Sequence, residues 1–118
     1  MAHDFKPNAG GKVSKKDAEG WIQKYDDEDR KDKDKDTRFV FFGKEFLMEI
    51  FKNAPEAAGI SFYLAKKHSD LEKKNVIDLV LVPTREDGTH IWPKLSDGKD
   101  EVSEGAYDNG ARCPPTCK

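Results

Sequence analysis

Cys113 and Cys117 are the two residues of this chain whose type and spacing most clearly permit chemistry. No other cysteine precedes them, and a Pro-Pro-Thr segment separates them. Proline holds φ near about −65° and so reduces the entropy of the loop between the thiols. Such a pair suits a local disulfide, two thiolate ligands for a soft metal such as Zn or Cu(I), or one nucleophilic thiolate assisted by Arg112.

Each use of the cysteine pair makes a demand on the structure. A polyproline-like segment is extended at about 3.1 Å per residue, whereas a disulfide needs the two Cα atoms within about 7 Å, so the segment must turn. A complete zinc site needs four ligands, and the three histidines, His3, His68 and His90, are distant from the cysteines in sequence. A disulfide staple, a metal site, a redox or catalytic thiol and an inert pair stay open as alternatives.

Two further pairs of residues are weaker candidates. Ser61 and Tyr63 alternate with apolar residues and face away from the expected core, so they would line a ligand-binding face if the sheet is uncovered there. A plain solvent-facing surface is the alternative. His90 and Trp92 flank Ile91, a pattern that packing explains better than ligation.

An acidic series in the charged part of the chain looks like the start of a calcium loop. It reads Asp32-x-Asp34-x-Asp36. A calcium loop then needs a glycine for a sharp turn and a bidentate glutamate at its twelfth position, and this chain has Thr37 and Gly43 there. We therefore expect no calcium site. No Gly-rich phosphate loop, paired helical histidines or nucleophile elbow is present either.

Composition limits the fold and its partners. The chain has 118 residues, 21 basic and 23 acidic, with a net charge of −2, which suits one small domain. This balance gives no general attraction to nucleic acid or to anionic lipid. No apolar run approaches the ~20 residues that span a bilayer. Because no apolar stretch typical of a secretory signal follows Met1, we expect a cytoplasmic protein without nucleic-acid or membrane partners.

The first expected element is an amphipathic helix over about 15–28. Ser14 is placed to cap its first turn. Apolar residues at helical spacing then form one stripe, on which Trp21 is expected to anchor the core. The stripe comprises Ala18, Trp21, Ile22 and Tyr25.

The remaining elements complete a two-layer α+β fold in the order α-β-α-β-β. We expect a solvated, mobile charged loop at 26–37, a strand at 38–42, a helix at 44–53, strands at 60–65 and 76–82, and an optional short fourth strand at 89–92. The strand residues expected to face the core are Ile60, Phe62, Leu64, Ile77, Leu79 and Leu81. The sheet would be small and mainly antiparallel, with two helices. Flexible arms at 1–13 and 94–118 would flank one domain at 14–93, because apolar residues are sparse in both arms.

Over most of its length from about residue 14, the sequence resembles a family of small uncharacterised bacterial proteins. The matching pieces are Trp21 on the first helix, 39–45, 59–65, 79–82 and the ending from Tyr107 to Cys117. The terminal Cys-Pro-Pro-x-Cys is the most specific piece, and the charged run at 26–36 and the charged region at 94–104 depart from the pattern. The resemblance implies a purposeful cysteine pair and no particular activity.

The function that we expect is a non-enzymatic interaction or accessory module. Its Cys113–Cys117 pair would form a local disulfide or bind a soft metal, and its C-terminal tail would meet a protein partner. One alternative is a small thiol-dependent redox protein or enzyme. The other is a ligand-binding module that uses the sheet face near Tyr63.

Overall fold

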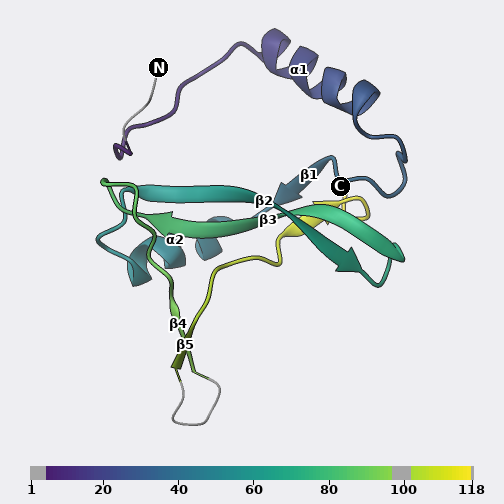
Figure 1. Cartoon of the computed structure of the whole chain (residues 1–118). Helices are drawn as coiled ribbons and strands as arrows, with labels where there is room; N and C mark the ends of the chain where they lie inside the picture. Colours follow the sequence, from purple (N-terminus) through teal and green to yellow (C-terminus); the bar gives the residue numbers. More distant parts are fainter. Residues whose placement is uncertain (1–4, 97–101, 118) are drawn as a thin grey trace. The chain divides into compact units, whose positions relative to one another are not determined.

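The structure, a computed structural model, describes residues 5–96 and 102–117 (Figure 1). Its elements are α1 (Lys15–Glu28), β1 (Phe39–Phe41), α2 (Lys44–Asn53), β2 (Gly59–Ser69), β3 (Lys74–Thr84), β4 (Lys94–Ser96), β5 (Val102–Glu104) and β6 (Ala111–Cys113). The expected α+β class is confirmed. The strands form three two-stranded sheets, β1–β6, β2–β3 and β4–β5, where we expected one small sheet. Within the described residues, neither helix is long and apolar enough to span a bilayer.

The chain divides into two compact units. Unit 1 comprises Met1–Ala9, Phe42–Leu64 and Leu79–Asn109, and unit 2 comprises Gly10–Phe41, Ala65–Asp78 and Gly110–Lys118. The β2–β3 ribbon therefore contributes to both units. Segments that we expected in flexible arms also belong to the units, since β4, β5 and β6 all lie after residue 93.

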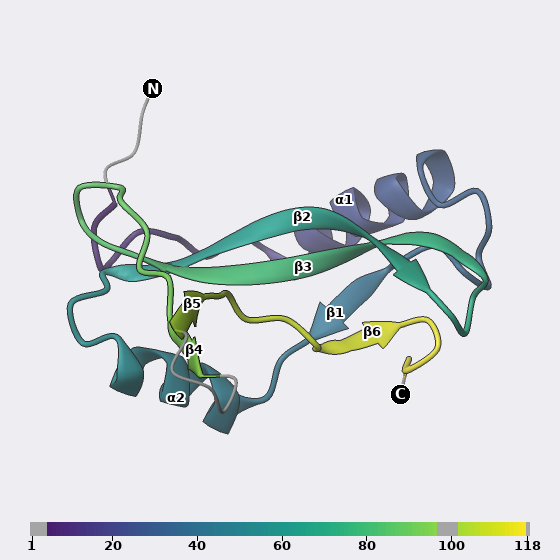
Figure 2. The same ribbon diagram turned by 60° about the horizontal axis from the view of Figure 1, so that its bottom comes forward.

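Unit 1 has an apolar interior between α2 and the end of β3. Ile50 of α2 and Leu81 of β3 are fully buried. The ring of Phe46 meets that of Tyr107 edge-on, with centroids 5.7 Å apart. Tyr107 in turn forms an isolated antiparallel bridge with Leu81, whose N–H donates to the Tyr107 carbonyl at 2.7 Å. A residue of the expected tail thus joins α2 to the ribbon, and α2 lies below this end of the ribbon in both views (Figures 1 and 2).

Unit 2 has an interior that is mainly polar. Its buried residues among those described are Arg30, Thr37, Glu72, Val76, Asp78, Arg112, Cys113 and Pro114. β1 and β6 pair antiparallel beside them, with Phe39 opposite Cys113 and Val40 opposite Arg112. Because little apolar surface is buried in this unit, we attribute its order chiefly to hydrogen bonds, ion pairs and the cross-link described below.

α1 has the bounds that we expected, and it begins at the expected cap, where Ser14 Oγ accepts the N–H of Asp17 at 3.0 Å. No residue of α1 is buried, and Trp21 is 63% exposed. The prediction of Trp21 as a core anchor is therefore wrong. Tyr25 holds the helix to the following segment instead, since its hydroxyl donates to the Thr37 carbonyl at 3.0 Å.

The β2–β3 ribbon is longer than expected and less buried. β2 continues to Ser69 and β3 begins at Lys74, beyond the strands expected at 60–65 and 76–82. Phe62 and Leu64 are 53% and 79% exposed. Ile77 is also exposed, whereas its neighbour Asp78 is buried and pairs with Lys67 at 3.5 Å. The expected apolar face fails because a two-stranded ribbon buries only those side chains that another element covers, and in unit 2 the inward position takes an ion pair.

The segment after β3 turns back without forming the optional fourth strand at 89–92. Thr84 and His90 form only an isolated antiparallel bridge. Asp87-Gly88 is a residue pair typical of tight turns, and a turn is present there: Gly88 has a φ of 89°, a conformation that favours glycine. This turn places His90 directly beside the end of β3.

Candidate functional site

A chain of four polar side chains crosses one face of the ribbon in unit 1. The Oγ atom of Ser61 lies 2.6 Å from Oγ1 of Thr84, which lies 3.1 Å from Nδ1 of His90. The Nε2 atom of His90 lies 2.6 Å from the hydroxyl of Tyr63. Ser61 and Tyr63 alternate on β2, and Thr84 is the last residue of β3, so the ribbon itself brings three of the four groups together.

The imidazole of His90 is held on both sides by aromatic rings. The ring of Tyr63 meets it edge-on at 5.5 Å, and that of Trp92 meets it at 5.7 Å. Arg85 fixes the main chain at this point, because its Nη1 donates to the His90 carbonyl at 3.1 Å. The expected packing of His90 and Trp92 is therefore present, and His90 also takes part in the hydrogen-bonded chain.

A pocket of about 330 Å³ lies at the Ser61 end of this chain. Its lining includes the apolar residues Phe5, Pro7, Ala58 and Ile60 and the hydroxyl residues Ser61 and Thr84. All of these belong to unit 1. The pocket therefore combines apolar walls with a hydroxyl pair that the ribbon positions.

One wall of the pocket comes from residues 5–9, which we expected in a flexible arm. The Phe5 ring packs on the turn at Gly88, where an added Cβ would lie 2.9 Å from a ring carbon. Nζ of Lys6 pairs with Glu86 at 3.2 Å. These two contacts attach the segment to the same turn that carries His90.

The predicted cysteine site lies in unit 2, and its two residues form a disulfide. The Cα atoms of Cys113 and Cys117 are 4.7 Å apart. The required turn is present, with cis peptide bonds at Cys113-Pro114 and Pro114-Pro115 and with the N–H of Thr116 donating to the Arg112 carbonyl at 2.9 Å. Cys113 is buried, whereas Cys117 is exposed. Of the alternatives left open, the local cross-link is the one present in this structure.

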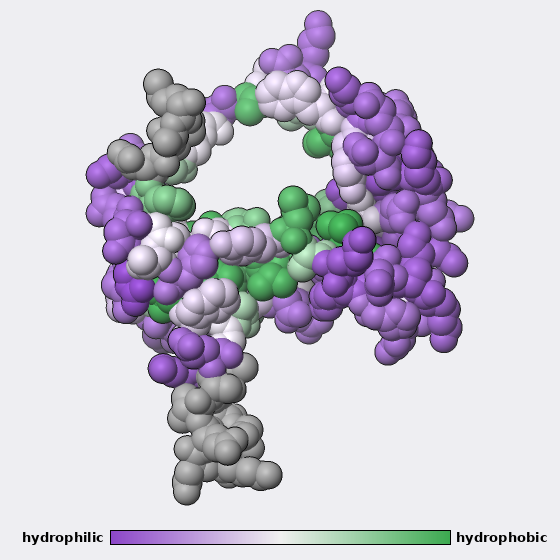
Figure 3. Space-filling view, in the orientation of Figure 1, coloured by the Kyte–Doolittle hydropathy of each residue, from purple (hydrophilic) through white to green (hydrophobic). Residues whose placement is uncertain are grey.

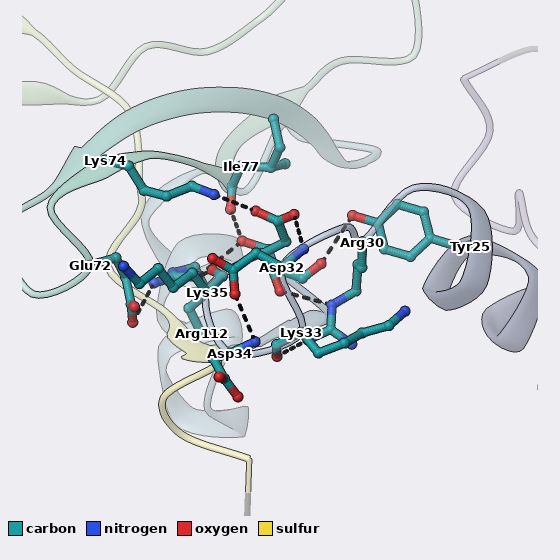
Figure 4. A network of polar contacts seen from close by, with 12 residues as sticks. Tyr25, Arg30, Asp32, Lys33, Asp34, Lys35, Glu72, Lys74, Ile77 and Arg112 are labelled. Carbon is teal, nitrogen blue, oxygen red and sulfur yellow. Dashed lines mark hydrogen bonds and ion pairs between the residues drawn. The ribbon is translucent and has the colours of Figure 1, made fainter.

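The disulfide neighbours a buried arginine. Arg112 donates from Nη1 to the Lys35 carbonyl at 3.0 Å and to Thr37 Oγ1 at 3.2 Å. Its Nη2 pairs with the buried Glu72 at 3.4 Å. Thr37 extends this hydrogen-bonded network to β3, because its hydroxyl donates to the Ile77 carbonyl (Figure 4). The disulfide thus lies at the end of β6, the strand that carries Arg112.

A second buried arginine organises the charged segment after α1. Arg30 donates to the carbonyls of Asp36 and Lys33, each at 2.8 Å, and pairs with Asp26 at 2.9 Å. The hydrogen bond from Arg30 holds the pKa of Asp26 below its usual value. The segment that we expected to be solvated and mobile is wound around this guanidinium, although its outer face is hydrophilic (Figure 3).

Asp32 and Asp36 of the acidic series accept hydrogen bonds from within the same segment. Asp32 accepts the N–H of Asp34 at 3.1 Å, and Asp36 accepts the N–H of Asp32 at 3.0 Å. Asp36 also binds Lys74 at 2.8 Å, and this hydrogen bond lowers the pKa of Asp36 and raises that of Lys74. Among the described residues, no three His, Cys, Asp or Glu side chains are grouped so as to hold a metal ion.

Thr84 is the one member of this hydrogen-bonded chain that the sequence pattern does not single out. The sequence indicates Ser61, Tyr63 and His90 separately and does not predict that their side chains are linked. A signal was available, because Thr84 and His90 stand at equal distances on either side of Asp87. A three-residue turn centred on Asp87 places these two residues opposite each other, whereas the two-residue turn usual for Asp-Gly would place Arg85 opposite His90.

Comparisons with protein-family models, curated proteins and solved structures find no match for this chain. The resemblance to small bacterial proteins therefore stays an expectation.

Proposed function

We propose that the protein is a small, non-enzymatic binding module whose ligand occupies the pocket of unit 1. The pocket volume of about 330 Å³ lies within the range of about 300–1,000 Å³ that is usual for small-molecule sites. The observation that best supports a binding function is the Ser61–Thr84 hydroxyl pair, which lies in an otherwise largely apolar pocket lining. Polar groups already fixed by a rigid scaffold bind a ligand without a further ordering cost.

In this proposal the disulfide of unit 2 is a structural staple. It ties the end of β6 to the turn that follows, next to the N–H of Arg38, which donates to the Cys113 carbonyl at 2.7 Å. That placement supports an accessory role, since the bond preserves the strand carrying Arg112. The partner that we expected at the C-terminal tail would then meet a closed turn rather than a free chain end.

A thiol-dependent redox role is the second candidate, and one observation favours it. Cys117 is an exposed residue, a setting that favours thiol exchange, whereas Cys113 is buried. In the cytoplasm, the location we propose from sequence, thiols are kept reduced, and a disulfide there is usually transient. Binding of Zn or Cu(I) would belong to the reduced form only, because both thiolates must be free to act as ligands.

A matched pair of alanine substitutions tests the pocket. Ala58 lines it, whereas its neighbour Ala57, also half-buried, is not among the lining residues. We expect the Ala58→Leu variant to bind indole at least tenfold more weakly than wild type in an NMR titration, because the added side chain fills the pocket. The Ala57→Leu variant should bind as wild type does. Equal binding by all three proteins, or no binding by any, would contradict the proposal.

A further inference from the structure

We propose that the pocket prefers ligands that carry a hydrogen-bond donor. Neither of the two side-chain hydroxyls in its lining has a proton left to donate, and Ser61 still has lone pairs that can accept a hydrogen bond. The ligand is then a compact apolar ring compound that carries one N–H or O–H group. This inference rests on the proposed binding function and adds the polarity that the ligand must have.

The argument begins at Thr84, which is 3% exposed. Its Oγ1 lies 3.0 Å from the Val82 carbonyl oxygen, 2.6 Å from Ser61 Oγ and 3.1 Å from His90 Nδ1. A hydroxyl has one proton and two lone pairs. The three contacts can all be hydrogen bonds at once in only one way, in which Val82, whose carbonyl can only accept, takes the proton of Thr84. Both lone pairs of Thr84 are then filled by donors, namely the Ser61 hydroxyl and the Nδ1–H of His90.

The protonation of His90 does not alter this arrangement. In the neutral imidazole Nδ1 carries the proton, so Nε2 accepts from the hydroxyl of Tyr63, 2.6 Å away. In the imidazolium form both nitrogens donate, and only the direction of the Tyr63 bond reverses. The bond from Nδ1 to Thr84 is the same in both forms, so Ser61 must donate to Thr84 in each.

Ser61 therefore turns an acceptor toward the ligand. Its proton is used by Thr84, and its two lone pairs remain. Ser61 is half-buried and lines the pocket. A ligand donor gains a hydrogen bond there, whereas a ligand acceptor meets oxygen lone pairs and forfeits its own bond to water.

The remaining lining fixes the shape and the apolar character of the ligand. Phe5, Pro7 and Ile60 offer ring and aliphatic surface. Lys6 also lines the pocket, but its ammonium is paired with Glu86 and both side chains are more than half exposed. A charge in that setting is largely screened by water and salt, so it does not set the polarity at Ser61.

Two ligands of nearly equal shape test this inference. Indole carries a ring N–H, and benzofuran has an oxygen acceptor in its place. We expect wild-type protein to bind indole at least about fivefold more tightly than benzofuran, the ratio for one net hydrogen bond. In the Ser61→Ala variant, the preference should fall below twofold. Thr84 keeps Val82 and His90 as partners in that variant, so the fold should be retained.

The outcomes separate the two proposals. The preference for a ligand that carries a hydrogen-bond donor is called the donor rule below. If wild type binds benzofuran as tightly as indole, the donor rule is overturned and the binding function is left intact. Binding of neither compound would overturn the binding function and the donor rule with it. A second pair, 2-naphthol and 2-fluoronaphthalene, repeats the comparison on wild type alone and needs no folded variant. Equal affinity in that pair would also overturn the donor rule.

Discussion

The hydroxyl oxygens of Ser61 and Thr84 lie 2.6 Å apart although 23 residues separate them in the chain. Strand pairing creates this proximity, since the N–H of Ala58, just before β2, donates to the carbonyl of Thr84 at 2.8 Å. The polar end of the pocket therefore depends on backbone register rather than on flexible side chains. Register is set by the whole ribbon, so the pair is preorganised for a ligand.

Removing the acceptor at Thr84 should change the tautomer of His90. In wild type we expect neutral His90 to carry its proton on Nδ1, because that proton is donated to Thr84. A Thr84→Val variant keeps the shape of the side chain but offers no acceptor, so the proton should move to Nε2. Two-bond ¹H–¹⁵N correlation spectra distinguish the tautomers, with the exposed His68 as an internal reference. An Nε2 proton in the wild-type spectrum would contradict the assigned network.

The disulfide should stabilise unit 2 more than unit 1. The closed loop spans Cys113 to Cys117, and a loop of that size contributes about 2 kcal/mol by the chain-entropy model. We expect a Cys113→Ser/Cys117→Ser variant to lose about this much, with faster hydrogen exchange at the Arg38 amide. Amides of unit 1, such as that of Leu81, should change less. Thiol counting supplies the check on redox state: no free thiol before reduction and two after it. Two free thiols in unreduced protein would contradict the staple.

The buried pair of Arg112 and Glu72 should matter more than an exposed pair. An Arg112→Leu variant leaves the Glu72 carboxylate buried without its guanidinium, at a cost of about 3 kcal/mol in urea unfolding. The matched control is Glu86→Gln, which removes the exposed partner of Lys6 and should cost less than about 1 kcal/mol. Equal losses in the two variants would show that the polar interior of unit 2 does not carry its stability.

Acid should weaken the charged segment through Asp26 and Asp36. Hydrogen bonds from Arg30 and Lys74 respectively lower their pKa values in the folded protein. The stabilisation from their ionised forms is therefore complete at pH values above the unfolded-state pKa of about 3.9. It is lost as the pH falls through the lower folded-state pKa values. The urea midpoint of wild type should thus drop below about pH 4. An Asp36→Asn variant should show a shallower drop, and parallel curves would refute the assignment.

Local features were predictable from sequence because their causes are local. The Ser14 cap gave the start of α1, and Pro55, two residues after the end of α2, stops that helix. The turn at Gly88 followed from its residue types. Antiparallel strands and the α+β class followed from hydrophobic alternation in the same way.

Burial was not predictable, because it depends on what covers a side chain. Trp21 and Phe62 stand at apolar positions of regular patterns, yet both are more than half exposed. Arg112 shows the converse, since it lies in a polar stretch but finds Lys35 and Glu72, which are 77 and 40 residues distant in the chain. The cysteine pair was identified by spacing, whereas the choice of a disulfide required the observed turn.

The most direct test of the central claim is a map of where a small ligand acts on the whole chain. In a ¹H–¹⁵N titration with indole, we predict changes in the amide chemical shifts of residues 58–61, Thr84 and residues 5–9. The amide of His90 should also shift. The amides of Arg112 and Cys113 in unit 2 should stay in place. Shifts gathered on α1 around Trp21, or no shifts at millimolar indole, would contradict the account.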